Sequence, residues 1–371
     1  MTFGRYVLWF AMCLAAYALI FAAQIPLRRK NRYALRIIIW VVKVFLTVFS
    51  AYLVMVLPGF FSYVGTYPGS ALYAAFLGDV IADLIMIPLT IIRNRKEDRP
   101  YLSINCIVSF MVTLAVVLYG TINMGTIRAN RVTYTSEKLT REHRFVFVSD
   151  VHMGNAQSRK TIADALERIK AEKPDFIVLG GDITDEFTTK DEMQDIFSMF
   201  GSLGIPVYYV YGNHDRQVGA FRTGRSNAFT SEELDKAIRD AGIAILKDEI
   251  EIISSDLVLL GREAYNVDSR KDPAILPTVS KDAYLLCIDH TPYMSGDILN
   301  TNADLQVSGH SHAGQFFPLH IIYNLIGLDD LGKYRIGDTE LFVSSGFSGW
   351  AVPFRTEAHS EYVVIDLLPA R

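Results

Sequence analysis

Hydrophobic residues are distributed unevenly along the chain, and the first third differs from the rest. Four long apolar runs occupy residues 6–25, 37–57, 70–92 and 101–122. Each is close to the roughly 20 residues that an α-helix needs to cross the hydrocarbon core of a bilayer. The pattern therefore predicts four transmembrane helices within residues 1–122. The first run lacks a small-x-small cleavage site and another run follows it soon, so we expect a retained anchor rather than a signal peptide.

From about residue 144 the pattern changes to short apolar strands that alternate with amphipathic helices, which is typical of an α/β fold. The expected strands cover residues 145–148, 176–179, 207–210, 244–246, 250–253, 257–260, 284–288, 341–343 and 362–367. The expected helices cover residues 158–171, residues 190–203 and a segment that begins near 231. We expect a polar linker and lead-in strand at residues 123–142 and one domain at residues 143–371.

The loops between the apolar runs differ sharply in charge. Basic residues fill the first and third loops, whereas residues 58–69 carry no charge; the basic residues are Arg28, Arg29, Lys30, Arg32 and Arg36, then Arg93, Arg95, Lys96 and Arg99. Cytoplasmic loops are enriched in Lys and Arg, so this pattern places the α/β domain outside the cytoplasm. Basic residues after the fourth run argue the other way, but the rule weakens before long domains. We expect a multi-pass cell membrane protein with an extracytoplasmic domain.

Three ionisable residues, Lys43, Asp79 and Asp83, interrupt the apolar runs. The two aspartates are four residues apart and share one helix face, which must point into a helix bundle because lipid does not solvate charge. One interpretation makes them a proton relay or an ion site. The alternative, which we favour, pairs Lys43 with an aspartate to fix the bundle, or lets the lysine reach the nearby membrane surface.

Net charge and cysteine content exclude some classes of function. The formal net charge is -4, and no basic stripe interleaved with aromatic residues is present, so we expect no nucleic-acid partner. Only three cysteines occur, and Cys287 is alone in the α/β part, so a disulfide within that domain is excluded. Nothing in the pattern indicates an oligomeric state.

Side chains that can bind metals gather directly after several expected strands. They are Asp150 with His152, Asp182, Asn213 with His214, His290, and His310 with His312. The carboxyl ends of strands are where α/β sheets place their sites. Each motif alone has an ordinary explanation, because Asp-x-His arises often by chance and Gly-Asp is a common turn. Five of the eight histidines lie in these clusters, however, which chance explains poorly.

These motifs, in this order, resemble those of the calcineurin-like metallophosphoesterase superfamily. The resemblance covers roughly residues 143–371 and rests on Asp150-x-His152, Gly181-Asp182, Gly212-Asn213-His214-Asp215, His290 and Gly309-His310-x-His312. The run at residues 309–315 is most similar to the membrane-associated bacterial branch of this superfamily, which includes YkuE-type and YaeI-type phosphodiesterases. That branch usually has glycine at the position of Ala313. The resemblance implies a layered β-sandwich flanked by helices, here preceded by four transmembrane helices.

The resemblance also implies a dinuclear metal-dependent phosphoesterase. One ion would be bound by Asp150, His152 and His312, the other by Asn213, His290 and His310, and Asp182 would bridge them. Imidazole, carboxylate and amide ligands suit Mn²⁺, Fe or Zn²⁺, and the sequence does not select among these metals. Two such ions can share a bridging water, lower its pKa and hold a phosphate ester or diester for attack by the resulting hydroxide.

Residues beside the expected ligands are candidates for further roles. His214, paired with Asp215, is expected to protonate or stabilise the leaving oxygen, and the alternative is a hydrogen-bonding role behind the ligands. Asn155 follows His152 in its loop, and Arg355 lies where that branch often carries arginine, so both are weaker candidates for substrate binding. Ordinary surface placement explains both of these residues equally well.

The run at residues 316–328, directly after the histidine pair, is unusually apolar. Most such runs belong to a core, and the alternative is a lip that enters the membrane and admits a lipid tail. We expect a phosphorylated lipid or envelope precursor as substrate. Two alternatives stay open: a cytoplasm-facing hydrolase of nucleotide-linked lipid pyrophosphates, similar to UDP-2,3-diacylglucosamine hydrolases, and a membrane sensor whose domain binds without catalysis.

Overall fold

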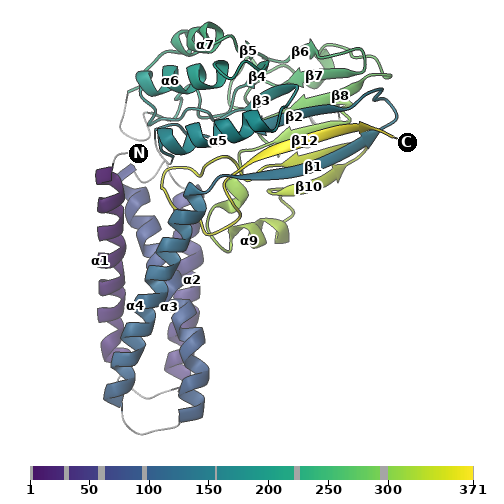
Figure 1. Ribbon diagram of the computed structural model, residues 1–371. Helices are drawn as coiled ribbons and strands as arrows, with labels where there is room; N and C mark the ends of the chain where they lie inside the picture. Colours follow the sequence, from purple (N-terminus) through teal and green to yellow (C-terminus); the bar gives the residue numbers. More distant parts are fainter. Residues whose placement is uncertain are drawn as a thin grey trace.

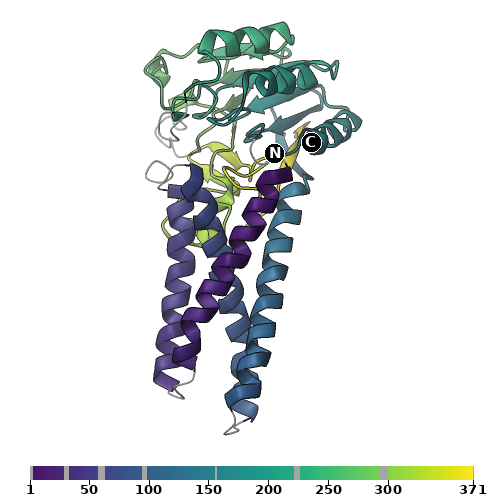
Figure 2. The ribbon, with the colours of Figure 1, turned by 90° about the vertical axis from the view of Figure 1, so that its left-hand side faces the viewer.

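Four long helices form an N-terminal bundle below an α/β domain (Figures 1 and 2). The computed structural model describes residues 3–28, 33–56, 63–93, 98–154, 157–220, 226–292 and 300–370. The helices are α1 (Phe3–Arg28), α2 (Tyr33–Val56), α3 (Tyr63–Arg93) and α4 (Asp98–Gly125). They run alternately down and up, so α1 and α3 end, and α2 and α4 begin, at the end of the bundle remote from the α/β domain.

Two segments of the described helices are long and apolar enough to cross a membrane, Tyr67–Met86 in α3 and Cys106–Gly125 in α4. The other two helices contain shorter apolar segments, Val7–Ala22 and Ile38–Tyr52. By length and composition, these helices are weak evidence for membrane association. The expectation that all four helices cross the bilayer stays a prediction.

The α/β domain contains two six-stranded mixed sheets that pack face to face. The first has the order β1-β12-β2-β3-β4-β5 and the second the order β10-β11-β9-β8-β7-β6. The strands of the first sheet are β1 (Arg128–Ser136), β12 (Glu361–Pro369), β2 (His143–Val148), β3 (Phe176–Gly180), β4 (Val207–Val210) and β5 (Ala244–Ile245). Those of the second are β10 (Gly332–Ile336), β11 (Thr339–Val343), β9 (Leu305–Ser308), β8 (Tyr284–Ile288), β7 (Leu257–Gly261) and β6 (Glu249–Ile252).

Buried side chains fill two layers, one on each face of the first sheet. Between the sheets, Phe145 and Phe147 of β2 pack with Leu286 and Ile288 of β8. On the other face, helices α5 (Arg159–Ala171), α6 (Lys190–Gly201) and α7 (Ser231–Asp240) cover the sheet with their apolar sides (Figure 1). Alternating strand residues point to opposite faces, so β2 and β3 contribute to both layers and read as continuous apolar runs. The mixed α/β fold with two sheets and flanking helices agrees with the expectation.

Polar side chains define where these helices begin. Thr189 and Thr230 accept hydrogen bonds from the backbone N–H groups of Glu192 and Glu233, and each glutamate side chain bonds back to the cap residue. Such a reciprocal capping box satisfies two backbone donors that the helix itself leaves unpaired. The expected helix start near residue 231 therefore has its physical cause in Thr230.

The helix bundle directly supports a segment of the α/β domain, residues 354–358. The backbone N–H of Arg355 donates to the carbonyl of Gly120 (3.0 Å), and the Asn123 amide donates to the carbonyl of Ala358 (2.6 Å). The Tyr73 hydroxyl lies 2.7 Å from the Thr356 hydroxyl. Of these residues, only Asn123 lies in the predicted linker at residues 123–142, where the structure also places β1. The two parts of the molecule are therefore packed together rather than joined by a free tether.

Apolar packing reinforces the same junction. The rings of Trp9 and Phe354 have centroids 5.0 Å apart, as do those of Tyr73 and Phe316. All four side chains are fully buried, in one cluster that also contains Leu319 and Val352. Burial of large aromatic side chains is among the strongest contributions to the stability of an interface. The loops that reach the bundle are thus held as firmly as core elements.

Inside the bundle, the three ionisable residues of the apolar runs meet. The Lys43 ammonium lies 2.8 Å from Asp79 Oδ2 and forms an even closer ion pair with Asp83. The Ser109 hydroxyl donates to the other oxygen of Asp79 at 2.7 Å. The predicted pairing of Lys43 with the aspartates is therefore what the structure contains.

Candidate metal centre

The predicted ligands converge at one edge of the two sheets. The side chains form two groups, and within each group the ligand atoms lie within 4.8 Å of one another. One group is Asp150, His152 and His312, and the other is Asp182, His290 and His310. The residues follow β2, β3, β8 and β9, so the parallel strands deliver them to the same edge. This convergence is what the sequence motifs predicted, and it joins residues up to 162 positions apart, from 150 to 312.

Short distances link the members of these groups and the two groups to each other. His152 Nε2 lies 3.3 Å from His312 Nε2, and Asp182 Oδ2 lies 2.9 Å from His290 Nε2. Asp150 Oδ1 is 3.6 Å from His312 Nε2 in its own group and 3.9 Å from His290 Nε2 in the other. The two groups therefore share a border and form one centre with two subsites.

Unusual backbone conformations place these side chains. Five of the expected ligands have positive φ angles: Asp150 (57°), His152 (46°), Asp182 (53°), His310 (72°) and His312 (50°). An L-residue in the left-handed region costs about 1–2 kcal/mol, and such strain clusters at functional sites. Ala313 also has a positive φ of 47°, so the alanine keeps the loop conformation that glycine would favour. At Gly309 an added Cβ would lie 2.3 Å from Asp150 Oδ2, so this close approach requires glycine.

The donor set fits metal ions. Asn213 Oδ1 is buried and has no hydrogen-bond partner among the described residues, although a buried amide oxygen normally has one. A metal ion would satisfy this oxygen. The Nε2 atoms of His152 and His312 also lie close together, 3.3 Å apart. Carboxylate, imidazole and amide donors together form a ligand set that Mn²⁺, Fe and Zn²⁺ accept.

The ionisation of the cluster reflects two buried carboxylates surrounded by imidazoles. Burial alone raises the pKa of Asp182, but the positive charges of His290 and His214 outweigh it and hold that pKa well below its usual value. For His290 the attraction of Asp182 outweighs burial and raises the pKa to about 10. Burial, with a smaller contribution from neighbouring imidazoles, lowers the pKa of His310 and His312 to about 3.

The ligands are oriented by partners behind them. His290 Nδ1 lies 2.8 Å from the carbonyl of Gly180, and His312 Nδ1 lies 3.2 Å from the carbonyl of Ser348. Asp185 Oδ2 lies 3.4 Å from His152 Nδ1. Metal-binding histidines generally donate their second N–H to a carbonyl or carboxylate, as the contacts of His290 and His312 allow, and this fixes the tautomer and the ring orientation. No motif or spacing in the sequence indicated Asp185 for this role.

His214 lies beside the centre, but its partner differs from the expected one. Its Nδ1 is 2.7 Å and 2.8 Å from the two carboxylate oxygens of Glu186. Burial lowers the pKa of His214, and the charges of Glu186 and Asp182 outweigh this and raise it to about 10. Its ring centroid lies 5.5 Å from that of His152.

The predicted pairing of His214 with Asp215 is wrong. The Asp215 carboxylate accepts hydrogen bonds from the backbone N–H groups of Asp182 (2.8 Å), Gly212 (2.7 Å) and Thr184 (2.9 Å). These bonds point it away from the imidazole and use it to fix the loops that carry Asp182 and Asn213. Asp215 is therefore a structural support of the centre, and Glu186 takes the position beside His214.

The two weaker substrate-binding candidates have different outcomes. Arg355 is fully buried, and its guanidinium donates to the carbonyls of His312 (3.0 Å), His359 (2.9 Å) and Ser345. It therefore braces the loop of a ligand from behind, and the predicted contact with substrate is wrong. Burial lowers the pKa of Arg355 to about 10. Asn155 lies outside the described residues, so its expected contact stays a prediction.

Two aromatic side chains flank the centre on different sides and were not singled out from the sequence. The Trp350 ring lies 5.8 Å from that of His214, and the Tyr265 ring lies 5.9 Å from that of His310. Both polar atoms of the Gln315 side chain hold the Trp350 backbone, at 2.8 Å and 3.1 Å. Gln315 belongs to the motif after the histidine pair, so that motif also fixes the position of Trp350.

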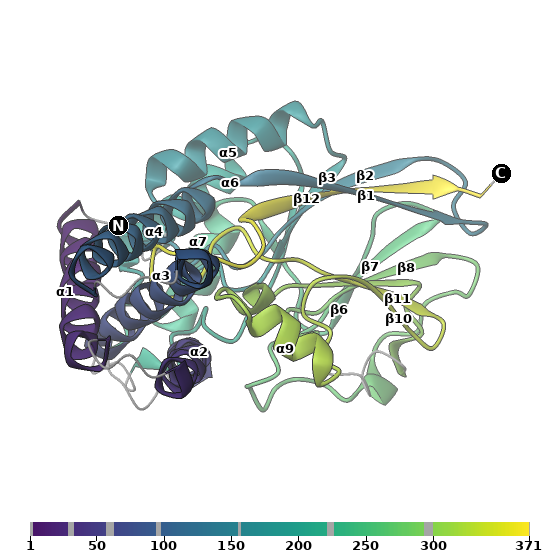
Figure 3. The same cartoon turned by 90° about the horizontal axis from the view of Figure 1, so that it is seen from below.

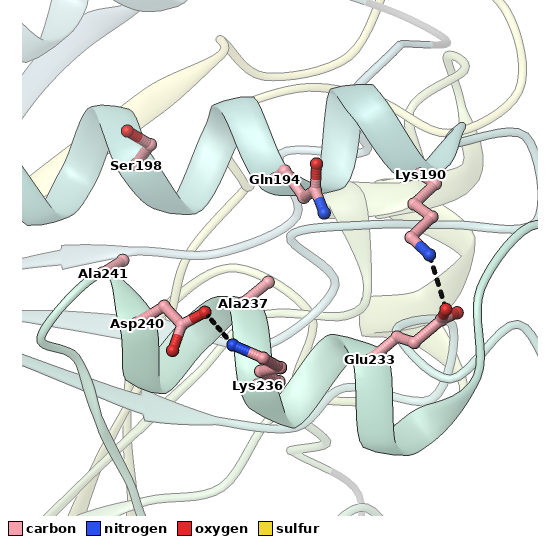
Figure 4. A pocket seen from close by; sticks show the side chains of 8 residues that line it. All are labelled: Lys190, Gln194, Ser198, Glu233, Lys236, Ala237, Asp240 and Ala241. Atoms are coloured by element: carbon pink, nitrogen blue, oxygen red, sulfur yellow. Dashed lines mark hydrogen bonds and ion pairs between the residues drawn. The ribbon is translucent and has the colours of Figure 1, made fainter.

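A separate groove of about 470 Å³ lies between α6 and α7 and contains none of the residues of the centre (Figure 4). Its walls carry ion pairs between Lys190 and Glu233 and between Lys236 and Asp240. These side chains satisfy one another and leave no converging set of ligands.

Comparison with known families agrees with this geometry. The sequence pattern described as calcineurin-like phosphoesterase matches residues 143–314, which include every expected metal ligand. Residues 143–314 belong to the calcineurin-like phosphoesterase family. The match and the two Asp/His groups support a metal-dependent phosphoesterase domain whose fold can hold two metal ions.

Similar proteins include bacterial and animal phosphoesterases. YkuE of Bacillus subtilis, an uncharacterized metallophosphoesterase, is 28% identical over 60% of this chain and 78% of its own. Phosphodiesterase YaeI of Escherichia coli is 25% identical over 53% of this chain and 73% of its own. The expected similarity to the YkuE and YaeI branch is confirmed. A zebrafish transmembrane protein with a metallophosphoesterase domain is 25% identical over 71% of this chain.

The match does not extend over the whole of some relatives. The chain spans 63% of the length of the zebrafish protein, and 62% of an uncharacterized metallophosphoesterase from Helicobacter pylori to which it is 26% identical. The similarity to these two relatives therefore covers only part of their length.

Proposed function

We propose that this phosphoesterase hydrolyses a phosphate ester or phosphodiester bond in a lipid or cell-envelope precursor at the outer face of the membrane. The observation that carries the proposal is the position of the centre. The Ser348 carbonyl and the Arg355 guanidinium both contact His312 from behind. They belong to one loop, and the backbone N–H of Arg355 in that loop donates to Gly120 of α4. A substrate that is itself held in the membrane would therefore lie close to the catalytic residues.

Seven side chains would hold two ions: Asp150, His152 and His312 one, Asn213, His290 and His310 the other, with Asp182 between them. Bound Mn²⁺, Fe or Zn²⁺ would supply Lewis acidity and a nucleophile from water at neutral pH. The chain itself would orient the ligands through Asp185, Gly180 and Ser348. Asp215 would keep the Asp182 loop closed through its three backbone hydrogen bonds.

His214 would handle the proton of the leaving group. It is partly exposed, it borders the His152 ring, and Glu186 holds its Nδ1, which leaves Nε2 to face the substrate. Donation of a proton to a leaving oxygen is a common task of histidine and contributes typically 10²–10⁴-fold to rate. Glu186 would orient the ring and keep it protonated.

The membrane topology is part of the proposal. All four helices would cross the bilayer, with α1 and α3 ending, and α2 and α4 beginning, on the cytoplasmic side. Arg28 and Arg93, the last residues of α1 and α3, lie at the end remote from the phosphoesterase domain (Figure 2). Because positive charge marks the cytoplasmic side, this arrangement supports an extracytoplasmic domain.

The activity is tested with the full-length protein purified in detergent. After removal of metals with a chelator, we expect no hydrolysis of bis(4-nitrophenyl) phosphate, and reloading with Mn²⁺ or Zn²⁺ should restore it with two ions per chain by elemental analysis. A protein that binds two ions without hydrolysing any phosphate ester would instead be a sensor. No bound metal would overturn the proposal.

The location is tested separately in spheroplasts. Protease added outside should cleave the C-terminal domain if the domain is extracytoplasmic. Protection of the domain from the protease would favour the cytoplasm-facing alternative, a hydrolase of nucleotide-linked lipid pyrophosphates. Comparison of the lipids of deletion and wild-type cells would then identify the class of substrate that accumulates.

A further inference from the structure

A short helix beside the metal centre exposes a continuous apolar surface. Helix α9 (Leu319–Leu325) follows the histidine pair, and its neighbourhood exposes Phe317 (44%), Ile321 (47%), Leu325 (81%) and Ile326 (65%). Ile321 and Leu325 are four residues apart and share one face of the helix. These four residues, which we call the α9 edge, are exposed although residues of this type are usually buried.

The other side of α9 is attached to the rest of the molecule. Leu319 is buried in the junction with the bundle, and Ile322 and Tyr323 pack against the same cluster. His320 Nδ1 lies 2.9 Å from Asp330 Oδ1, which holds the polar side of the helix to the domain. The orientation of the α9 edge is therefore fixed, and its exposure is not the result of a detached segment.

The bundle indicates where the membrane surface lies. Exposed apolar side chains follow α4 from Ile104 to Ile122. Ile122 lies 18 positions after Ile104, which corresponds to a helix length of roughly 27 Å. This length is close to the roughly 30 Å thickness of a hydrocarbon core. The next residue, Asn123, is buried and donates to carbonyls of residues 355 and 358. The outer boundary of the hydrocarbon core therefore lies at the level of this loop.

The α9 edge lies at the same level. The backbone N–H of Phe317 donates to the Thr356 hydroxyl (3.0 Å), and the Tyr73 hydroxyl of α3 donates to the Phe317 carbonyl (2.8 Å). Helix α9 also contacts α2, and the two lie side by side on the underside of the domain (Figures 1 and 3). Helix α2 itself exposes the apolar side chains Phe45, Phe49 and Tyr52.

We propose that the α9 edge is inserted into the outer leaflet of the bilayer, where it guides a membrane-held phosphate ester to the metal centre. This inference rests on the proposed function for the identity of the substrate, but not for the insertion itself. Partial insertion of an apolar helix face at the headgroup level is a stable arrangement. Phe317 is only five positions after His312, so the inserted edge lies close in sequence to two expected ligands, His310 and His312.

The insertion is tested by a fluorescent label at Leu325. In full-length protein with Cys106→Ala, Leu325→Cys is labelled with an environment-sensitive fluorophore in phosphatidylcholine nanodiscs. Ile252→Cys is the matched control, because Ile252 is 70% exposed on β6, in the sheet away from the bundle. We expect nitroxide-bearing lipids to quench the label at Leu325 at least twofold and to leave the label at Ile252 unchanged.

The link to catalysis is tested with charge substitutions. Ile321→Glu with Leu325→Glu should lower the rate on phosphatidic acid in vesicles at least tenfold relative to the rate on soluble bis(4-nitrophenyl) phosphate. The matched control is Ile252→Glu with Ile275→Glu, two exposed positions of the domain outside the α9 edge. The control should leave the ratio of the two rates unchanged.

The outcomes separate the two proposals. Quenching at Leu325 without hydrolysis of any vesicle lipid supports insertion and contradicts the lipid-phosphate substrate. Absence of quenching overturns the insertion, whatever the enzyme hydrolyses. A label at Leu325 that reports an apolar environment but is not quenched by lipid assigns the surface to a second copy of the chain, and this result also overturns the insertion. A ratio unchanged by the charged pair overturns the guiding role.

Discussion

The helix bundle and the phosphoesterase domain both bury a cluster of carboxylates, and they neutralise it in different ways. In the bundle, Asp79 and Asp83 are paired with Lys43, and Ser109 adds a hydrogen bond. In the domain, the ion-pair partners of Asp150 and Asp182 within the described residues are histidines, and burial lowers the pKa of two neighbouring imidazoles. One region supplies its own cation, whereas the other presents ligands to cations from solution.

This difference separates a structural cluster from a catalytic one. A buried carboxylate needs a compensating charge or hydrogen bonds, because its desolvation costs several kcal/mol. A lysine that provides this charge also fills the space and leaves nothing for a ligand. Histidines placed around carboxylates leave the space open for exchangeable metal ions and hence for substrate. The same argument predicts that loss of a carboxylate abolishes chemistry in one region and affects only stability in the other.

The largest effect is expected at Asp182. Asp182→Asn removes the charge between the two subsites, so the protein should retain fewer than two ions and lose at least about 10³-fold in kcat/KM, as expected for an essential catalytic group. The measurement is hydrolysis of bis(4-nitrophenyl) phosphate together with elemental analysis. Asp366→Asn is the matched control, since Asp366 forms a partly exposed pair with Arg144. Full activity of Asp182→Asn would remove the distinction between the two regions.

The next effect is expected at His214. His214→Ala should lower kcat by about 10²–10⁴-fold on a phosphodiester with a poor leaving group and much less on a 4-nitrophenyl ester. Glu186→Gln keeps the contact but removes its charge, and a loss of about 10–100-fold is expected, as for other partners that orient a site. Both variants should keep two ions. Full turnover of His214→Ala on the poor leaving group would contradict the proton-donor role.

The sequence predicts much of this fold where apolar runs are continuous and well bounded. The expected bounds of β4 and β8 coincide with the observed ones, because both strands are short apolar runs buried in the sheets. Strand β10 was not predicted, since its residues Gly332–Ile336 are mostly polar and form an edge of the sheet next to β11. Helix α9 was ambiguous because an apolar run of this length fits both a core and a surface that enters lipid.

The site was predicted to the extent that its residues belong to motifs at strand ends. Asp150, His152, Asp182, His290, His310 and His312 converge as expected because parallel strands end at one edge. Glu186 and Trp350 carry no such signal, since their places depend on how loops far apart in sequence pack together. The error about Asp215 has the same origin. Adjacency to His214 did not reveal that the turn aims its carboxylate at three backbone N–H groups.

A smaller effect is expected in the bundle. Lys43→Met leaves the buried Asp79 and the partly buried Asp83 without their cation and should lower the free energy of unfolding by about 3–5 kcal/mol, measured in detergent. Combining it with Asp79→Asn and Asp83→Asn removes the uncompensated charge, so most of the stability should return. Both proteins should hydrolyse bis(4-nitrophenyl) phosphate at the normal rate while folded. A loss of turnover in the folded triple variant would give the bundle cluster a catalytic role and break the comparison.

The smallest effect is expected at a third buried carboxylate, Asp256, which is neutralised neither by lysine nor by metal. It accepts hydrogen bonds from Thr140 N (2.7 Å) and Ser254 Oγ (2.5 Å), and it lies 3.0 Å from His143 Nε2. Burial raises its pKa, but these bonds outweigh burial and hold the pKa well below its usual value. Asp256→Asn should therefore lower stability at pH 7 by about 1–2 kcal/mol, the cost of weakened hydrogen bonds to a charged group.

The pH dependence of this loss distinguishes hydrogen bonding from metal binding. Because the pKa of Asp256 is lower in the folded than in the unfolded chain, its stabilisation is complete above the unfolded value of about 4 and falls away below it. The difference in unfolding free energy between wild type and Asp256→Asn should thus be constant from pH 7 to about 5 and shrink towards pH 3. It should not change with a chelator. A difference that grows on acidification, or that depends on metal, would show that Asp256 acts through the metal centre rather than through its own hydrogen bonds.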